Sequence, residues 1–182
     1  MSSTFKVTAA TVLALLYSAW AIAHLAQAST VVVASPDNAG YQSWVDQVKR
    51  VPTPDIGLEV TIGSTCGGLG CSGAGTGQIE LMGFAPRSTF YHELGHEFDV
   101  WAMTEADRSA FIALVGRPWA TWWDVGRYDE GYMAGEWFAE VYAICAGAKH
   151  VYPAWEYTTG SLLLAGWRVR QACGLMRWAA AH

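Results

Sequence analysis

Two histidines and a glutamate lie together in the stretch FYHELGHEFDVW, residues 90–101. His92 and His96 are four residues apart, so on a helix they lie on one face about one turn apart. Two imidazoles in that arrangement can bind one metal ion at about 2.0–2.1 Å. Glu93 lies one step round the helix, where it can act as a general base on a water molecule that the metal activates. The pattern therefore predicts a hydrolytic zinc site.

A zinc site of this kind needs a third protein ligand and keeps one position open for water. A metzincin would have glycine and histidine where this chain has Asp99 and Ala102, which excludes that class. His150 and His182 are isolated in the sequence, and we do not expect either to bind the metal.

Carboxylates on a later helix are better candidates for the third ligand. The segment MAGEWFAEVYAICAG, residues 133–147, is apolar almost all round except for Glu136 and Glu140. Such a helix is expected to be buried, and a bare carboxylate inside would be destabilising unless it were paired or bound to a metal. We predict that Glu136 binds zinc and that Glu140 holds a ligating histidine from behind. The alternative is that the two glutamates form the polar stripe of a half-exposed helix.

The paired motifs HELGHEFD and EWFAE resemble the gluzincin metallopeptidases, and most closely the small bacterial members and the lethal-factor-like group. The resemblance covers about residues 90–146. It implies one Zn²⁺ ion held by His92, His96 and Glu136, with Glu93 as general base and Glu140 behind a ligand. It also implies that the strand expected over residues 77–84 is the edge along which a substrate peptide lies.

In the lethal-factor-like group a tyrosine seven residues before the third ligand steadies the oxyanion, and here Asp129 has that position. We therefore favour Tyr128, eight residues before Glu136, as the donor to the developing charge. Tyr132, four residues before, is the alternative.

Asp99 and a group of tryptophans lie close to these motifs in the sequence. Asp99 is on the motif face, where it could orient a ligand or close the helix end, or could pair with an arginine such as Arg87 or Arg127. We expect the tryptophans to pack in the core, and the alternative is that they line a substrate cleft: Trp119, Trp122 and Trp123.

The first 28 residues have the pattern of an export signal. An apolar run from Val7 to Ala23 follows Lys6, and Ala26 and Ala28 form the small-residue site that signal peptidases recognise. We predict cleavage after Ala28, and the alternative is a membrane anchor over residues 7–28.

In an oxidising compartment, the four cysteines favour disulfides. The short GGLG loop lets Cys66 meet Cys71, and the pairing left for the other two is Cys145 with Cys173. A zinc site built on cysteines is the weaker alternative, because the chain has no C-x-x-C pair.

The expected fold is α+β, a minimal zincin-like domain over residues 29–182. We predict a small antiparallel sheet in which strands over 56–63 and 77–84 form a hairpin. Helices are expected within residues 35–51, over 133–147 and over 158–181. A further helix should carry the HELGH motif, with Ser88 or Thr89 as its cap. Another should follow Thr104, which caps it, with Asp107 completing a near capping box.

The net charge of −5 on 182 residues argues against a nucleic-acid partner. We therefore expect a secreted, monomeric zinc endopeptidase that acts on peptides or proteins and has no membrane contact after cleavage. One alternative is an exported zinc-binding protein that has lost catalysis and acts as a binding or immunity factor. Another is a membrane-anchored protein whose zinc only stabilises the fold.

Overall fold

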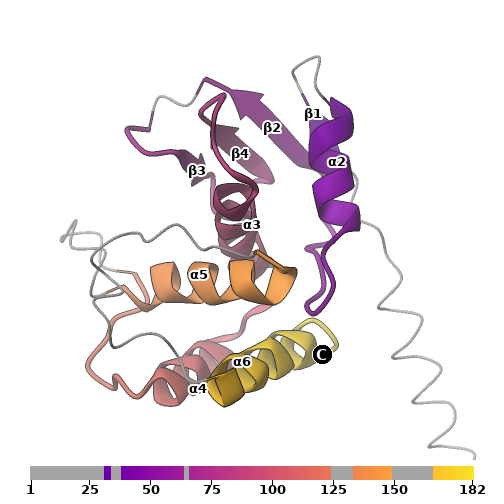
Figure 1. The fold of residues 1–182 in the computed structure, drawn as a ribbon. Helices are drawn as coiled ribbons and strands as arrows, with labels where there is room; N and C mark the ends of the chain where they lie inside the picture. Colours follow the sequence, from indigo (N-terminus) through magenta and orange to yellow (C-terminus); the bar gives the residue numbers. More distant parts are fainter. Residues whose placement is uncertain (1–30, 34–37, 64–65, 124–132, 149–165) are drawn as a thin grey trace, which may run out of the picture.

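The computed structural model describes residues 31–33, 38–63, 66–123, 133–148 and 166–182. Figure 1 shows the sheet and the helix α2 at one end of the molecule and α4, α5 and α6 at the other, with α3 between them. The predicted α+β class is confirmed. The elements along the chain are β1 (Val31–Val33), α2 (Asn38–Asp46), β2 (Leu58–Ile62), β3 (Gly70–Ser72), β4 (Gln78–Leu81), α3 (Arg87–Ala102), α4 (Glu105–Val115), α5 (Ala134–Ala146) and α6 (Gly166–Ala179).

The sheet is mixed, which corrects the predicted antiparallel hairpin. Its strand order is β1-β2-β4-β3, and β4 runs parallel to β2, with Val60 opposite Ile79. β3 pairs antiparallel with β4 at the edge of the described sheet. The physical reason is that β3 takes up part of the connection between the other two strands. The chain therefore reverses twice before β4 begins.

One face of the sheet is covered by the motif helix. Leu58, Val60, Ile79 and Leu81 are completely buried, whereas Glu59 between the first two is exposed. This alternation is what a strand with one covered face requires. The core continues from there into the contact between α3 and α5, where the rings of Phe98 and Tyr142 lie 5.1 Å apart.

Of the two helix caps predicted from the sequence, the structure confirms one. Thr104 and Asp107 form a complete capping box at the start of α4, and Gly116 ends that helix at φ 74°. The predicted cap of α3 at Ser88 or Thr89 is wrong, because α3 begins at Arg87. Pro86 precedes it, and its carbonyl already accepts the N–H of Thr89 at 2.9 Å.

Both predicted disulfides are present. Cys66 is bonded to Cys71 and Cys145 to Cys173, with Cα atoms 6.4 and 5.7 Å apart. The second bond joins α5 to α6, as expected. Within the described parts of the chain, no helix is both long enough and apolar enough to cross a membrane. The predicted signal segment lies outside the described residues, as does the part of the last predicted helix before Gly166.

The disulfide between α5 and α6 should contribute more to stability than the one in the β2–β3 connection. It closes a loop of 28 residues rather than 5, and the loop-entropy account assigns about 3–4 kcal/mol to the former and about 2 kcal/mol to the latter. Urea denaturation of the two double-alanine variants measures the difference. An equal loss in both would contradict the expectation.

Candidate metal centre

The helix α3 brings the two histidines of the motif to one point. His92 and His96 have their Nε2 atoms 3.1 Å apart, and their rings lie nearly at right angles. His96 is buried, and His92 is largely so. The side chains of His92, Glu93 and His96 place ligand atoms close enough together to hold a metal ion.

The helix α5 adds a carboxylate to the same point. The Oε2 atom of Glu136 lies 3.2 Å from Nε2 of His92 and 3.6 Å from Nε2 of His96. Ligand atoms bound at about 2.0–2.1 Å in a tetrahedron are about 3.3 Å from one another. The three separations of 3.1, 3.2 and 3.6 Å therefore fit the spacing of three ligands around one ion.

A glycine allows α5 to approach α3 at this level. A Cβ atom on Gly95 would lie 2.8 Å from the Cα of Ala139 and 3.1 Å from the Cβ of Tyr142. A glycine in the middle of a helix costs about 1 kcal/mol against alanine, so its presence here by itself indicates a close approach to the backbone. Glu136 lies one turn before Ala139, so the same contact brings its carboxylate to the histidines.

Glu140 lies behind His92. Its Oε1 atom is 3.6 Å from Nδ1 of His92, while Glu136 lies near the other ring nitrogen. Its Oε2 atom is buried and has no hydrogen-bond partner among the described residues. Because a carboxylate at this nitrogen fixes the tautomer that leaves Nε2 free for a metal, the position suits the predicted supporting role.

The charges of the centre favour a cation between the ligand groups. Burial lowers the pKa of His92, but its contacts with Glu136 and Glu140 outweigh burial and raise the pKa well above the usual value. Burial raises the pKa of Glu136, but hydrogen bonds with both histidines hold it far below the usual value. Binding of a metal ion to these groups would therefore compete with protonation of His92.

Glu93 is buried next to His92 and His96, and its carboxylate lies close to the nitrogens of both rings. Burial raises the pKa of its carboxyl, which makes it a better proton acceptor than an exposed glutamate. The β3 backbone lies close to it, since a Cβ atom on Gly70 would be 3.1 Å from Oε1 of Glu93.

A cleft of about 790 Å³ opens over these groups. One wall is formed by residues 66–72, which include β3, and the other includes Trp123 and Glu136. β4 lies inside the sheet, so the expectation that residues 77–84 form the edge beside the site is corrected. β3 has that position, because it pairs with β4 at the end of the strand order.

Asp99 belongs to the scaffold rather than to the metal-ligand group. It is fully buried, and its two oxygens accept hydrogen bonds from Nε of Arg108 at 2.9 Å and from the indole of Trp122 at 2.8 Å. An arginine partner was one of the two expectations, but the arginine is neither of those named. Arg87 donates to Gln47 instead, and Arg127 lies outside the described residues.

The three tryptophans divide between the core and the cleft. Trp122 is buried and packs on Phe111, as expected of a core residue. Trp123 lines the cleft, with its ring 5.4 Å from that of His96, so the expectation of core packing is wrong for this residue. Trp119 is 52% exposed and packs against Trp137.

Sequence reasoning missed Glu97. This carboxylate is fully buried, and it accepts hydrogen bonds from the hydroxyl of Ser72 at 2.5 Å and from the N–H groups of Gly75 and Gly77 at 2.9 Å each. The available signal was its place on the motif helix four residues after Glu93, opposite a glycine-rich segment. The zinc motif assigns no role to the residue directly after the second histidine, so the motif does not single out Glu97.

Of four further residues named in the sequence analysis, the structure describes one. Tyr128, Tyr132 and His150 lie outside the described residues. His182 lies at the chain end, where its ring stacks on that of Trp178 at 4.6 Å.

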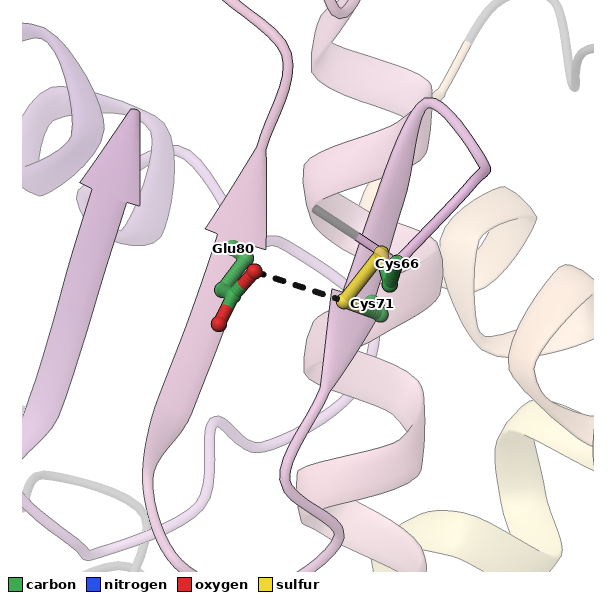
Figure 2. Close-up of side chains that lie close together, drawn as sticks. All are labelled: Cys66, Cys71 and Glu80. Carbon is green, nitrogen blue, oxygen red and sulfur yellow. Dashed lines mark hydrogen bonds between the residues drawn. A yellow bond between two sulfur atoms is a disulfide. The ribbon is translucent and has the colours of Figure 1, made fainter. Parts of the chain in front are cut away.

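A second group of potential ligand atoms involves the first disulfide. Figure 2 shows Cys66 and Cys71 joined on β3 and its preceding loop, with Glu80 on the neighbouring strand. The Sγ atom of Cys71 is 4.0 Å from Oε2 of Glu80. Zinc binds cysteine as the thiolate, and these sulfurs are bonded to each other. In this state the group does not offer a metal site, and the disulfide acts as part of the cleft wall.

The chain was compared with models of known protein families, with curated proteins and with solved structures, and no match was found in any of the three.

Proposed function

We propose that this chain is a secreted zinc endopeptidase of the gluzincin type. The observation that carries the proposal is the convergence of Nε2 of His92, Nε2 of His96 and Oε2 of Glu136 within 3.1–3.6 Å of one another, at the floor of an open cleft. Glu93 lies in the same cleft, buried but not part of that triangle.

Two imidazoles and one carboxylate favour zinc over other common ions. Calcium and magnesium prefer oxygen ligands, whereas zinc accepts imidazole nitrogen and carboxylate oxygen in a four-coordinate site. Three protein ligands leave the fourth position free, which is the arrangement of catalytic rather than structural zinc. The cleft beside His92 and His96 supports an accessible fourth position.

A bound zinc ion would act as a Lewis acid on water and on the peptide carbonyl. Glu93 would accept the proton of the attacking water and pass it to the leaving amine. Its burial, which raises its pKa, supports both transfers. Glu140 would hold the ring of His92 through Nδ1, so that Nε2 stays directed at the metal.

The edge strand β3 offers the place for the substrate main chain. It pairs with β4 on one side only in the described sheet, and it forms one wall of the cleft. A peptide added along β3 as a further strand would bring its carbonyl groups past Glu93. This supports an endopeptidase, because an added strand extends on both sides of the bond that is cut.

Digestion of a peptide library tests the proposed activity. The zinc-loaded chain should cleave internal peptide bonds, and removal of the metal with a chelator should stop cleavage. Zinc bound in full without cleavage of any peptide would instead support the alternative of an exported binding or immunity factor.

Export is a separate part of the proposal, supported by the two disulfides and by the pattern of residues 1–28. The mature protein should begin at Ser29. N-terminal sequencing of exported material checks this. A chain that retains Met1 would favour the membrane anchor over residues 7–28.

A further inference from the structure

The turn between β3 and β4 is attached to the motif helix by one buried side chain. The backbone N–H groups of Gly75 and Gly77 each donate a hydrogen bond to Oε2 of Glu97, and the hydroxyl of Ser72 donates one to Oε1. Ser72 is the last residue of β3, and Gln78 is the first of β4. Glu97 therefore holds the end of β3, the turn and the approach to β4 at once.

The same face of α3 also carries Glu93. The two glutamates are four residues apart, so they lie one turn apart on one side of the helix. A Cβ atom on Gly70, at the start of β3, would lie 3.1 Å from Oε1 of Glu93, and Ser72, at the end of β3, is hydrogen-bonded to Glu97. Consecutive turns of the helix thus contact the two ends of the edge strand.

The sequence of the turn suits this close contact. A Cβ atom on Gly70 would lie 2.8 Å from Leu81, and one on Gly75 would lie 2.5 Å from Val100 of α3. Gly75 and Gly77 also have positive φ angles of 89° and 77°, which glycine adopts without strain. The backbone can therefore turn its N–H groups towards the carboxylate of Glu97.

A buried carboxylate with three donors forms a stiff connection. Hydrogen bonds to a charged acceptor are stronger than neutral ones, and the fully buried carboxylate of Glu97 would be penalised by burial if it lost these donors. The strand that lines the cleft is consequently tied to the helix that carries the histidines and Glu93. Its distance from the metal centre does not depend on the sheet alone.

We propose that Glu97 is a positioning residue, which holds the edge strand β3 in a fixed position relative to the metal centre. A peptide that pairs with β3 as an added strand then has its main chain aligned with Glu93. The inference rests on the proposed function. It assigns to Glu97 a role in peptide binding and none in metal binding or proton transfer. Its loss should weaken binding of extended peptides while ligands that reach only the metal bind as before.

Two hydroxamate probes separate these contributions. Acetohydroxamate can reach only the metal and its immediate surroundings, whereas N-acetyl-trialanine hydroxamate adds a peptide main chain without large side chains. Their dissociation constants are measured by calorimetry on the zinc-loaded protein, with zinc content and the denaturation midpoint of every variant. The wild type should bind the trialanine probe more tightly than acetohydroxamate.

In Glu97→Ala we expect the trialanine probe to bind about tenfold more weakly, because the strand is no longer held in register. Acetohydroxamate affinity and zinc content should stay within about twofold of the wild type, since the metal ligands are untouched. Glu97→Gln keeps an acceptor oxygen for the two glycine N–H groups and should restore most of the affinity. Glu59→Ala, an exposed carboxylate on β2, is the matched control and should change neither constant.

Ser72→Ala gives the same test with a smaller change to the structure, and it replaces Glu97→Ala if that variant does not fold. It removes one of three bonds and should weaken the trialanine probe by about threefold. Unchanged preference for the trialanine probe in a folded Glu97→Ala or Ser72→Ala variant would overturn the inference, as would a wild type that binds both probes equally. Failure of both probes on zinc-loaded wild type would overturn the proposed open metal position, and the inference with it.

Discussion

The Glu93→Gln variant should keep its full zinc content and lose peptide hydrolysis by about 10²–10⁴-fold. Glutamine has nearly the same shape, but its amide does not accept a proton as a base. The carboxylate is buried beside the triangle of ligand atoms and is not a corner of it, so the metal should not depend on it. Zinc analysis beside a peptidase assay measures both quantities in the same sample.

The two carboxylates of α5 provide the comparison for Glu93→Gln. Glu136→Ala removes a corner of the triangle and should lose zinc and activity together. Glu140→Ala should lie between the other two variants, with zinc affinity lowered by about 10–100-fold, because His92 loses its support at Nδ1. The expected order of zinc content is therefore Glu93→Gln, then Glu140→Ala, then Glu136→Ala.

Other orders would point to other ligand sets. Full zinc in Glu136→Ala but not in Glu140→Ala would mean that the metal ligand lies one turn later on α5. Full zinc in both variants would overturn the gluzincin proposal.

The Gly95→Val variant should lose about 3 kcal/mol or more of its free energy of unfolding. The added atoms have no space, since even a Cβ would lie 2.8 Å from the Cα of Ala139 on α5. Backbone does not move aside as a side chain does, so the two helices must separate. Glu136 would then leave the histidines, and zinc affinity should fall by about tenfold or more together with stability.

A glycine in another helix supplies the control. Gly174 lies in α6, and among the described residues a Cβ there would meet only the flexible end of Arg177, at 3.8 Å. Gly174→Val should change stability by less than about 1 kcal/mol and leave zinc affinity unaltered. Denaturation curves and zinc titrations of both variants make the comparison. Equal stability of the two variants would contradict the close approach at Gly95.

The local features of the site could be predicted from the sequence because they depend on neighbours along the chain. The spacing of His92 and His96 determines their common face on any helix. Thr104 and Asp107 form the predicted capping box, and a glycine inside a helix, such as Gly95, indicates a close contact without identifying its partner. The prediction of Glu136 as the third metal ligand depends on one further physical rule, that a buried helix should not contain unpaired carboxylates.

The features that the sequence did not determine all depend on which distant segments meet. The direction of β4 follows from the whole path of the β2–β4 connection, and a hairpin and a parallel pair have the same alternation of residues. The partner of Asp99 proved to be Arg108, and the donors to Glu97 come from a turn 20–25 residues away. A buried carboxylate needs a hydrogen-bond partner, but only the packing of α3 against the sheet decides which group becomes that partner.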